Sequence, residues 1–367
     1  MNKLAMKRIL LGLGALAVVI AIIAIIVITG NSGGEKTGKV GFIITGSIDE
    51  SGWNRMHYSG LQKACEDLDI DLMLKENVKE FTGACNDAIV ELAENGAEMI
   101  ILSSYGYSEE AKDLVKEYPD IAFYVISSEH HSENMTSYFV RMYQARYLAG
   151  ILAGMKTETN KVGYVAAMAN NEVNRGINAF TLGVKRANPS AEVVVAWTGE
   201  WDSEEKETAA ANALIEGEQV DVITYHQNQT YVVEAAEAAG IYSIGYHEAL
   251  ENCSEKYLTA VVCDWTLVYK ELIRSYITGN TNVKTNYWLG LEAGVVDLTP
   301  YSAEVTGAEM EAIEIAKIAL ISGVDVFSGV IYDNEGNKRC GEKESIGDEL
   351  LLEQFDWYVE GVRFYEE

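Results

Sequence analysis

The stretch VGFIITGSIDESGWNRMHY, residues 40–58, decides the fold class. It begins with an apolar run typical of a buried strand, passes through a polar loop, and continues into an amphipathic segment. A strand that runs directly into a helix is the first half of a βαβ unit. The loop is unusual because Trp53 and Asn54 stand where the chain only needs to turn.

The same alternation continues along the chain. The pattern predicts further strands at 71–75, 99–103, 122–127, 161–166, 192–198, 220–225, 242–245 and 258–262. It predicts helices at 53–67, 82–95, 108–118, 174–187, 204–216, 231–239, 266–278 and 308–322, and an extended piece at 286–290. We expect an α/β protein with two doubly wound parallel-sheet lobes, between which the chain crosses more than once. Lobe 1 is predicted at 39–142, completed by about 258–300, and lobe 2 at 143–257, completed by about 301–367.

The N-terminus predicts a membrane helix. Three basic residues at positions 3, 7 and 8 precede an uncharged apolar run over 9–30, close to the roughly 20 residues that span a bilayer. We expect an uncleaved signal/anchor helix over 1–30, with its basic end in the cytoplasm. Cleavage near residues 29–33 is the alternative. Residues 31–38 read as a flexible tether, and the remainder is expected outside the cell, on the outer face of the cytoplasmic membrane.

Composition excludes several classes of function. The 367 residues carry a formal charge of −28 without clusters of Lys and Arg, which argues against nucleic acid as a partner. The five cysteines form no C-x-x-C pair, so no metal site is predicted. The spacing does not decide whether two of them form a disulfide. Residues 46–52 have the wrong glycine spacing for a dinucleotide loop, and neither a phosphate-binding loop nor a nucleophile elbow occurs. We therefore expect a binding protein without a cofactor rather than an enzyme.

In open parallel sheets, ligands bind beyond the carboxyl ends of the strands. The loops predicted there carry aromatic, amide, acidic and histidine side chains: Trp53, Asn54, Tyr105, Tyr107, Trp201, Asp202, His226, Gln227, Asn228, His247, Asp264 and Trp265. Aromatic faces stack on planar heterocycles, and amides or carboxylates read their edges, although sugars also use aromatic platforms. Each residue also has a structural reading, with Asn54 and Asp202 as helix caps and His226 as an ordinary buried histidine.

Several motifs together resemble the basic membrane protein (BMP) family, also called the purine nucleoside receptor group. They are GSIDESGWN (46–54), YQARYLAGILAG (143–154), NAFTLGV (178–184), WTGEWD (197–202), GIYSIG (240–245), LTAVV (258–262), YWLG (287–290) and VFSG (326–329). The resemblance covers residue 39 to the C-terminus. It implies a substrate-binding protein of an ABC transporter with the type I periplasmic-binding fold, whose partners are an ABC permease and its ATPase.

The resemblance also implies a ligand, a purine base or nucleoside held between two hinged lobes. Trp53 would stack on the ring and Asn54 would read its edge. A second aromatic face would come from Tyr105, Tyr107, Trp201 or Trp265. Further edge contacts are expected from Asp202, Gln227, Asn228 and Asp264.

Three departures from the family pattern refine this expectation. The first cysteine is Cys65, so the apolar helix would replace the usual lipid anchor. His247 stands where nucleoside-binding members place an aspartate on the ribose, and Cys263 stands near their lysine. Trp53, in place of the commoner phenylalanine, favours a free base over a nucleoside. An extracellular nucleoside hydrolase and a ligand-sensing lobe for another membrane protein remain the alternatives.

Overall fold

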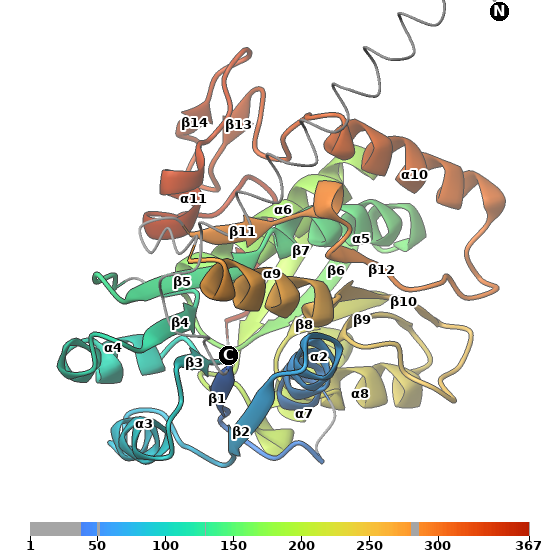
Figure 1. Ribbon diagram of the computed structural model, residues 1–367. Helices are drawn as coiled ribbons and strands as arrows, with labels where there is room; N and C mark the ends of the chain where they lie inside the picture. The colour runs from blue at the N-terminus through green and yellow to red at the C-terminus, as the bar shows by residue number, and fades with distance from the viewer. Residues whose placement is uncertain (1–37, 50–51, 129, 280–285, 367) are drawn as a thin grey trace, which may run out of the picture. The chain divides into compact units, whose positions relative to one another are not determined.

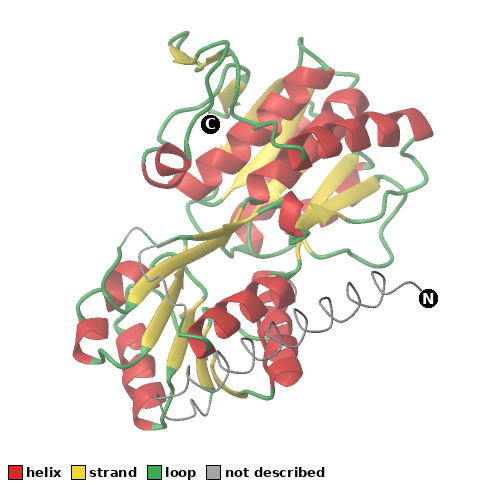
Figure 2. Cartoon of the chain, turned by 45° about the horizontal axis from the view of Figure 1, so that its top comes forward, coloured by secondary structure: helices red, strands yellow, loops and turns green. Residues whose placement is uncertain are grey.

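The computed structural model describes residues 38–49, 52–128, 130–279 and 286–366. The predicted anchor over 1–30 and residues 31–37 of the tether lie outside these ranges. Among the described residues, no helix has both the length and the apolar character needed to cross a bilayer. Residues 39–367 form one compact unit. Its two large sheets each lie between helices (Figure 2), and β13 (Ile331–Tyr332) and β14 (Lys338–Cys340) form a separate two-stranded sheet.

The first sheet is entirely parallel, with strand order β11-β5-β4-β3-β1-β2. Its strands are β1 (Lys39–Ile43), β2 (Asp71–Lys75), β3 (Met99–Leu102), β4 (Ala122–Ile126), β5 (Met135–Val140) and β11 (Tyr287–Leu289). The helices of this lobe are α2 (Trp53–Leu68), α3 (Ala84–Glu94), α4 (Tyr107–Ala111), the 3-10 turn η1 (Leu114–Glu117) and α9 (Trp265–Ile277). Helices α2 and α9 pack side by side although about 200 residues separate them (Figure 1).

The second sheet has strand order β12-β10-β9-β8-β6-β7-β15, and only β12 runs antiparallel to its neighbour among its described strands. Its strands are β6 (Lys161–Ala166), β7 (Glu192–Trp197), β8 (Val222–His226), β9 (Tyr242–His247), β10 (Tyr257–Cys263), β12 (Val296–Leu298) and β15 (Val362–Phe364). Its helices are α5 (Met142–Lys156), α6 (Asn171–Ala187), α7 (Glu204–Asn212) with the π turn η2 (Ala213–Gly217), α8 (Tyr231–Ala239) and α10 (Gly307–Ile321). Shorter elements follow β11 and α10: η3 (Leu291–Ala293), β13 (Ile331–Tyr332), β14 (Lys338–Cys340) and α11 (Asp348–Glu353).

Helices α5 and α6 form the tightest contact of lobe 2. A Cβ atom added at Gly150 would lie 2.0 Å from the carbonyl oxygen of Phe180, and one at Gly183 would lie 2.1 Å from that of Tyr147. Real side chains do not tolerate such distances, so only glycine lets the two backbones approach this closely. The glycines of the YQARYLAGILAG and NAFTLGV motifs are therefore explained by packing.

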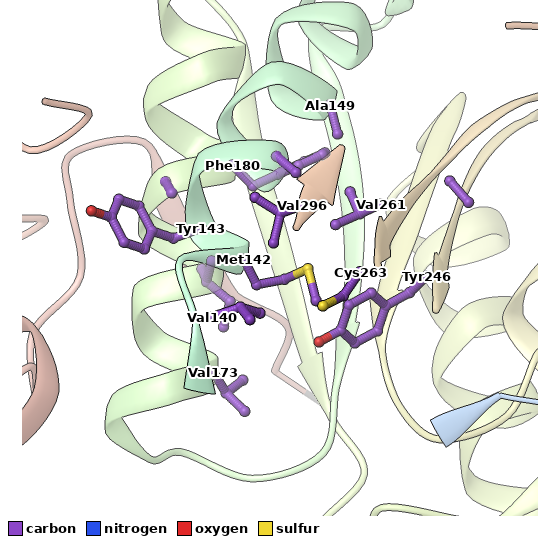
Figure 3. Close-up of a cluster of buried hydrophobic side chains, with 14 of the residues drawn as sticks. Val140, Met142, Tyr143, Ala149, Val173, Phe180, Tyr246, Val261, Cys263 and Val296 are labelled. Carbon is purple, nitrogen blue, oxygen red and sulfur yellow. The ribbon is translucent and has the colours of Figure 1, made fainter. Parts of the chain in front are cut away.

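The chain crosses between the lobes between β5 and α5, between β10 and α9, and between β11 and β12. The ends of these crossovers meet in a buried apolar cluster that includes Val140, Met142, Cys263 and Val296 (Figure 3). The side chains of Met142 and Cys263 lie next to each other there, and Cys263 pairs with Val296 across the β10–β12 ladder. The predicted multi-crossover hinge is thus built around one hydrophobic cluster.

Two expectations about the chain's organisation need correction. Residues 258–300 were expected to complete lobe 1, but β10 and β12 join the second sheet, and only α9 and β11 join the first lobe. A short apolar run predicts a strand but does not show which of the two sheets the strand joins. This explains why β10 and β12 were assigned to the wrong lobe. Strand β5 was not predicted at all, and the helix expected at 108–118 divides into α4 and η1.

The C-terminal segment packs on α6, as β15 pairs with β7 at the edge of the second sheet. Asn174 donates to the carbonyl of Phe355 at 3.0 Å, and Asn178 accepts from the amide of Val359 at 2.9 Å.

All five cysteines are free, so the disulfide that the sequence left undecided does not form.

Candidate functional site

A cavity of about 160 Å³ opens between the lobes, at the carboxyl ends of both sheets. At roughly 10–15 Å³ for each enclosed water, this space matches a small molecule of on the order of ten heavy atoms. Nine of the twelve predicted site residues line it: Trp53, Asn54, Tyr105, Trp201, Asp202, His226, Gln227, Asn228 and His247. The cavity thus lies at the strand ends, where the rule predicts a binding site, and the ligand contacts of these residues stay a prediction.

Trp53 is the first residue of α2 and is held rigidly. Its indole N–H donates to the carbonyl of Ser103 at 2.8 Å, and only 9% of the residue is exposed. The ring centroid of His57 lies 4.1 Å from that of the indole. The ring of Trp265 lies 3.8 Å from that of His57 and also meets the indole edge to face at 5.8 Å. Burial, with a contribution from His247, lowers the pKa of His57, so the imidazole is neutral. These ring contacts and the hydrogen bond to Ser103 fix the orientation of the indole, whose remaining exposed surface faces the cavity.

The capping alternatives for the aromatic loops are not supported. The N-cap position of α2 is Gly52, and Asn54 instead accepts from the Thr45 hydroxyl at 3.3 Å while lining the cavity. In lobe 2, Ser203 caps α7, which leaves Trp201 and Asp202 on the cavity wall. The local sequence is thus compatible with both roles, and the structure assigns these three residues to the cavity.

His226 and its neighbours form a buried polar wall on the side of lobe 2. Nε2 of His226 lies 3.4 Å from Oε1 of Glu172, which the sequence had not singled out. Burial and the charge of Arg146 lower the pKa of His226 to about 4. Burial alone would raise the pKa of Glu172, but hydrogen bonds to His226 and Ser127 and the charge of Arg175 lower it. At neutral pH the wall therefore carries a carboxylate beside a neutral imidazole.

His247 lies at the edge of the same wall in a strained conformation. Its φ is +76°, a left-handed value that is rare for residues other than glycine and often found at functional sites. Burial lowers its pKa, and its Nε2 lies 2.8 Å from the carbonyl of Gln227. Because a carbonyl only accepts, Nε2 carries the proton and Nδ1 is left as an acceptor.

Gln227 forms hydrogen bonds to the loop that carries Trp201. In the orientation that satisfies both ends of its amide, it donates to the carbonyls of Glu200 and Trp201 and accepts from Thr198 at 2.8 Å. Its side chain lines the cavity, but its hydrogen bonds hold the 198–201 loop in place.

Three predicted residues do not reach the cavity. Tyr107 is buried in lobe 1, where its hydroxyl donates to the carbonyl of Val78. Asp264 caps α9 by accepting from the amides of residues 266 and 267. Trp265 packs against His57 and against the indole of Trp53, and it does not line the cavity. Each follows a strand, as the rule requires, but the direction of its side chain is set by packing and capping.

Sequence reasoning missed eight residues of the cavity wall: Thr45, Gly46, Lys79, Glu80, Ser104, Ile126, Glu172 and Tyr246. Of these, Glu80 fixes the loop after β3, because its carboxylate accepts from the Ser104 hydroxyl and the amide of Gly106, both at 2.6 Å. Lys79 and Glu80 follow a strand end after β2, so the strand-end rule would have found them. Glu172 also follows a strand, β6, but an acid in the first turn of a helix is common, so the rule alone did not select it.

The lobes also touch beside the cavity. Glu248 of lobe 2 accepts from the amide of Gly52 at 2.7 Å and lies 3.3 Å from Nη2 of Arg55. Gly52 has a φ of +84°, and a Cβ atom there would lie 1.9 Å from the carbonyl oxygen of Asn228. Only glycine permits this approach, which places the first-loop motif directly against lobe 2.

Comparison with known proteins assigns the family. The Bmp family, described as "ABC transporter substrate-binding protein PnrA-like", matches residues 37–324. A purine-binding protein of Brucella abortus is 30% identical over 94% of this chain and 98% of its own length. TsgA13 of Haloferax volcanii, named for glucose binding in an ABC transporter, is 30% identical over 91% of this chain and 83% of its own.

Solved structures agree with the fold. The crystal structure of a transcriptional activator of the comK gene from Bacillus halodurans has a TM-score of 0.68 at 28% identity, covering 78% of this chain and 98% of that chain. A solute-binding protein of an ABC transporter system from Conexibacter woesei has a TM-score of 0.61 at 20% identity, with 78% and 97% covered. The chain belongs to the Bmp family of PnrA-like ABC transporter substrate-binding proteins and is a binding protein rather than an enzyme.

Proposed function

We propose that this substrate-binding protein captures a purine in the inter-lobe cavity and holds the free base in preference to the nucleoside. The observation that carries the proposal is the fixed indole of Trp53, which faces the cavity from lobe 1 while Trp201 lines it from lobe 2. Stacking on an aromatic side chain contributes about 1–3 kcal/mol per base. Two aromatic walls on opposite lobes favour a flat ligand that both lobes contact.

The polar residues of the cavity suit a neutral heterocycle. Asn54, Asp202 and Asn228 line the wall with donors and acceptors for ring edges. The Brucella relative is named for purine binding, which supports the same ligand class.

The preference for the base rests on two positions. His247 and Cys263 occupy the places where nucleoside-binding relatives are expected to hold the ribose. His247 uses its Nε2 proton on a backbone carbonyl, and Cys263 is buried in the hinge cluster and does not line the cavity (Figure 3). Neither side chain provides the charged contact that a ribose would receive from aspartate or lysine.

A sugar is the second candidate, because the Haloferax relative is named for glucose binding and aromatic platforms also bind sugars. The two candidate ligands differ in the contacts that they require from the cavity wall. A hexose needs hydrogen bonds around its whole circumference, whereas a base needs two apolar faces and polar edges. Trp53 and Trp201 on opposite lobes favour the base.

The cellular setting follows from the family. An ABC permease and its ATPase would receive the ligand, and the body of the chain would lie on the outer face of the cytoplasmic membrane, anchored by or exported through the predicted N-terminal helix.

Thermal unfolding of the purified protein against adenine, guanine, hypoxanthine, their nucleosides, ribose and glucose tests the proposal. A ligand at 100 times its dissociation constant stabilises the native state by about 2.7 kcal/mol, which predicts a rise in Tm on the order of 5–10 °C. We expect this rise with at least one base and a smaller one with its nucleoside. A rise with glucose and none with any purine would refute the purine assignment and leave the family unchanged.

A further inference from the structure

Glu172 occupies a central place that the family assignment does not explain. It lies in the first turn of α6 in lobe 2, and its side chain is about 10% exposed. It lines the main cavity and also two smaller cavities of about 20 and 10 Å³ beside it. Burying a carboxylate here costs free energy unless neighbouring groups pair with its charge and donate hydrogen bonds to it.

The two oxygens of this carboxylate have different partners. Oε1 faces Nε2 of His226, from its own lobe, at 3.4 Å. Oε2 accepts from the hydroxyl of Ser127, which follows β4 in lobe 1, at 2.9 Å. Ser127 adopts a left-handed φ of +49°, so its backbone is held in an uncommon conformation where it meets lobe 2. The carboxylate therefore contributes to the cavity wall and to a hydrogen bond between the lobes.

The surroundings keep this group ionised. Arg175, 3% exposed, lies nearby, and its charge together with the hydrogen bonds to His226 and Ser127 lowers the pKa of Glu172. An ionised carboxylate can only accept hydrogen bonds. It therefore attracts ligand atoms that carry a proton and repels ligand atoms that present a lone pair. The carboxylate can thus discriminate between the donor and acceptor edges of a heterocycle.

We propose that Glu172 is a specificity-determining residue that accepts a ring N–H of the bound base and links this contact to lobe closure through Ser127. The inference rests on the proposed function and deepens it, because it defines the ligand as a heterocycle with a ring N–H donor at the Glu172 edge. A free purine base has an imidazole N–H that a nucleoside lacks, since the sugar replaces it. The link to closure follows because the Ser127 hydrogen bond exists only while the lobes are in contact.

The test uses methylated ligands and a matched variant. Calorimetric titration of the full-length protein would compare hypoxanthine with its 1-, 7- and 9-methyl derivatives. The wild type should bind at least one derivative about 10- to 100-fold more weakly than hypoxanthine, the range for a hydrogen bond to a charged group. In Glu172→Gln, hypoxanthine should lose affinity by a similar factor, and the ratio between it and that derivative should fall to near one.

Two controls separate this role from closure in general. Glu248→Gln removes a second carboxylate that joins the lobes, one that does not line the cavity, and should keep the wild-type ratio between hypoxanthine and each derivative. Ser127→Ala should weaken every ligand by the same factor. Glu172→Asp, which keeps the charge, covers the case in which the Gln variant fails to fold, and should weaken hypoxanthine selectively. The wild-type ratio for all three derivatives in the folded Gln or Asp variant would overturn the inference alone, whereas no purine binding by the wild type would overturn the proposed function with it.

Discussion

Replacing Trp53 by alanine should weaken purine binding strongly. The indole is backed by His57 at 4.1 Å and fixed by its hydrogen bond to Ser103, so the stacking surface is organised before the ligand arrives. Loss of one stacking partner removes about 1–3 kcal/mol, equivalent to a rise in Kd of about 5- to 150-fold. A preorganised platform favours the upper part of that range, because no side-chain entropy is regained when the ligand leaves.

The same substitution also affects the fold. Trp53 is 9% exposed, and truncating such a buried aromatic costs about 3–5 kcal/mol of stability. Binding should therefore be measured by calorimetric titration well below the Tm of the variant. Trp53→Phe is the control, since it keeps an aromatic face and loses the indole N–H, and its Kd should rise less than that of the alanine variant. Unchanged affinity in a folded alanine variant would refute the stacking role.

Three further predictions concern packing, titration and closure. Gly183→Ala should lower the free energy of unfolding by on the order of 1–3 kcal/mol, because its Cβ would lie 2.1 Å from the Tyr147 carbonyl, while Gly307→Ala, with no atom within 4 Å, should leave the Tm nearly unchanged. Burial raises the pKa of Glu207 from 4.5 to about 7, so the folded state holds this proton more tightly and the free energy of unfolding falls as the pH rises from 4.5 to 7. Denaturant titrations at pH 5 and pH 8 should show that Glu207→Gln removes up to about 3 kcal/mol of this fall. The same pH dependence in the variant and the wild type would contradict the raised pKa. Glu248→Gln should increase the Kd of every ligand by less than about fivefold, since the ion pair at the cavity edge is partly exposed, and a larger or ligand-selective loss would show that this carboxylate does more than join the lobes.

The sequence predicted the lobes well because strands and helices alternate with clear periods. It placed Trp53 at the start of a helix that follows a strand, which is where the structure has it. It did not show that His57 and Trp265 support the indole, because the ring contacts between α2 and α9 join residues about 200 positions apart. Contacts of that kind arise only when the tertiary fold is complete.

The differences between the predicted site residues and the residues that line the cavity have a common physical origin. Asp264 follows a strand and precedes a helix, and at such a junction an aspartate can either face a ligand or cap the helix. The structure selects capping. Glu172 shows the reverse case, since its position in the first turn of α6 suggests an ordinary interaction with the helix dipole, yet its side chain reaches the cavity wall. Side-chain direction, which decides between such roles, depends on packing that the local pattern does not encode.

The central claim is that a purine base is held between the two lobes on the indole of Trp53. A crystal structure of the protein with the base that raises the Tm most would test this claim directly. The account predicts the purine ring in the inter-lobe cavity, with its centroid about 4.5–7 Å from that of Trp53 and a ring N–H directed at Glu172. A purine bound outside this cavity, or a ring that does not contact Trp53, would contradict it.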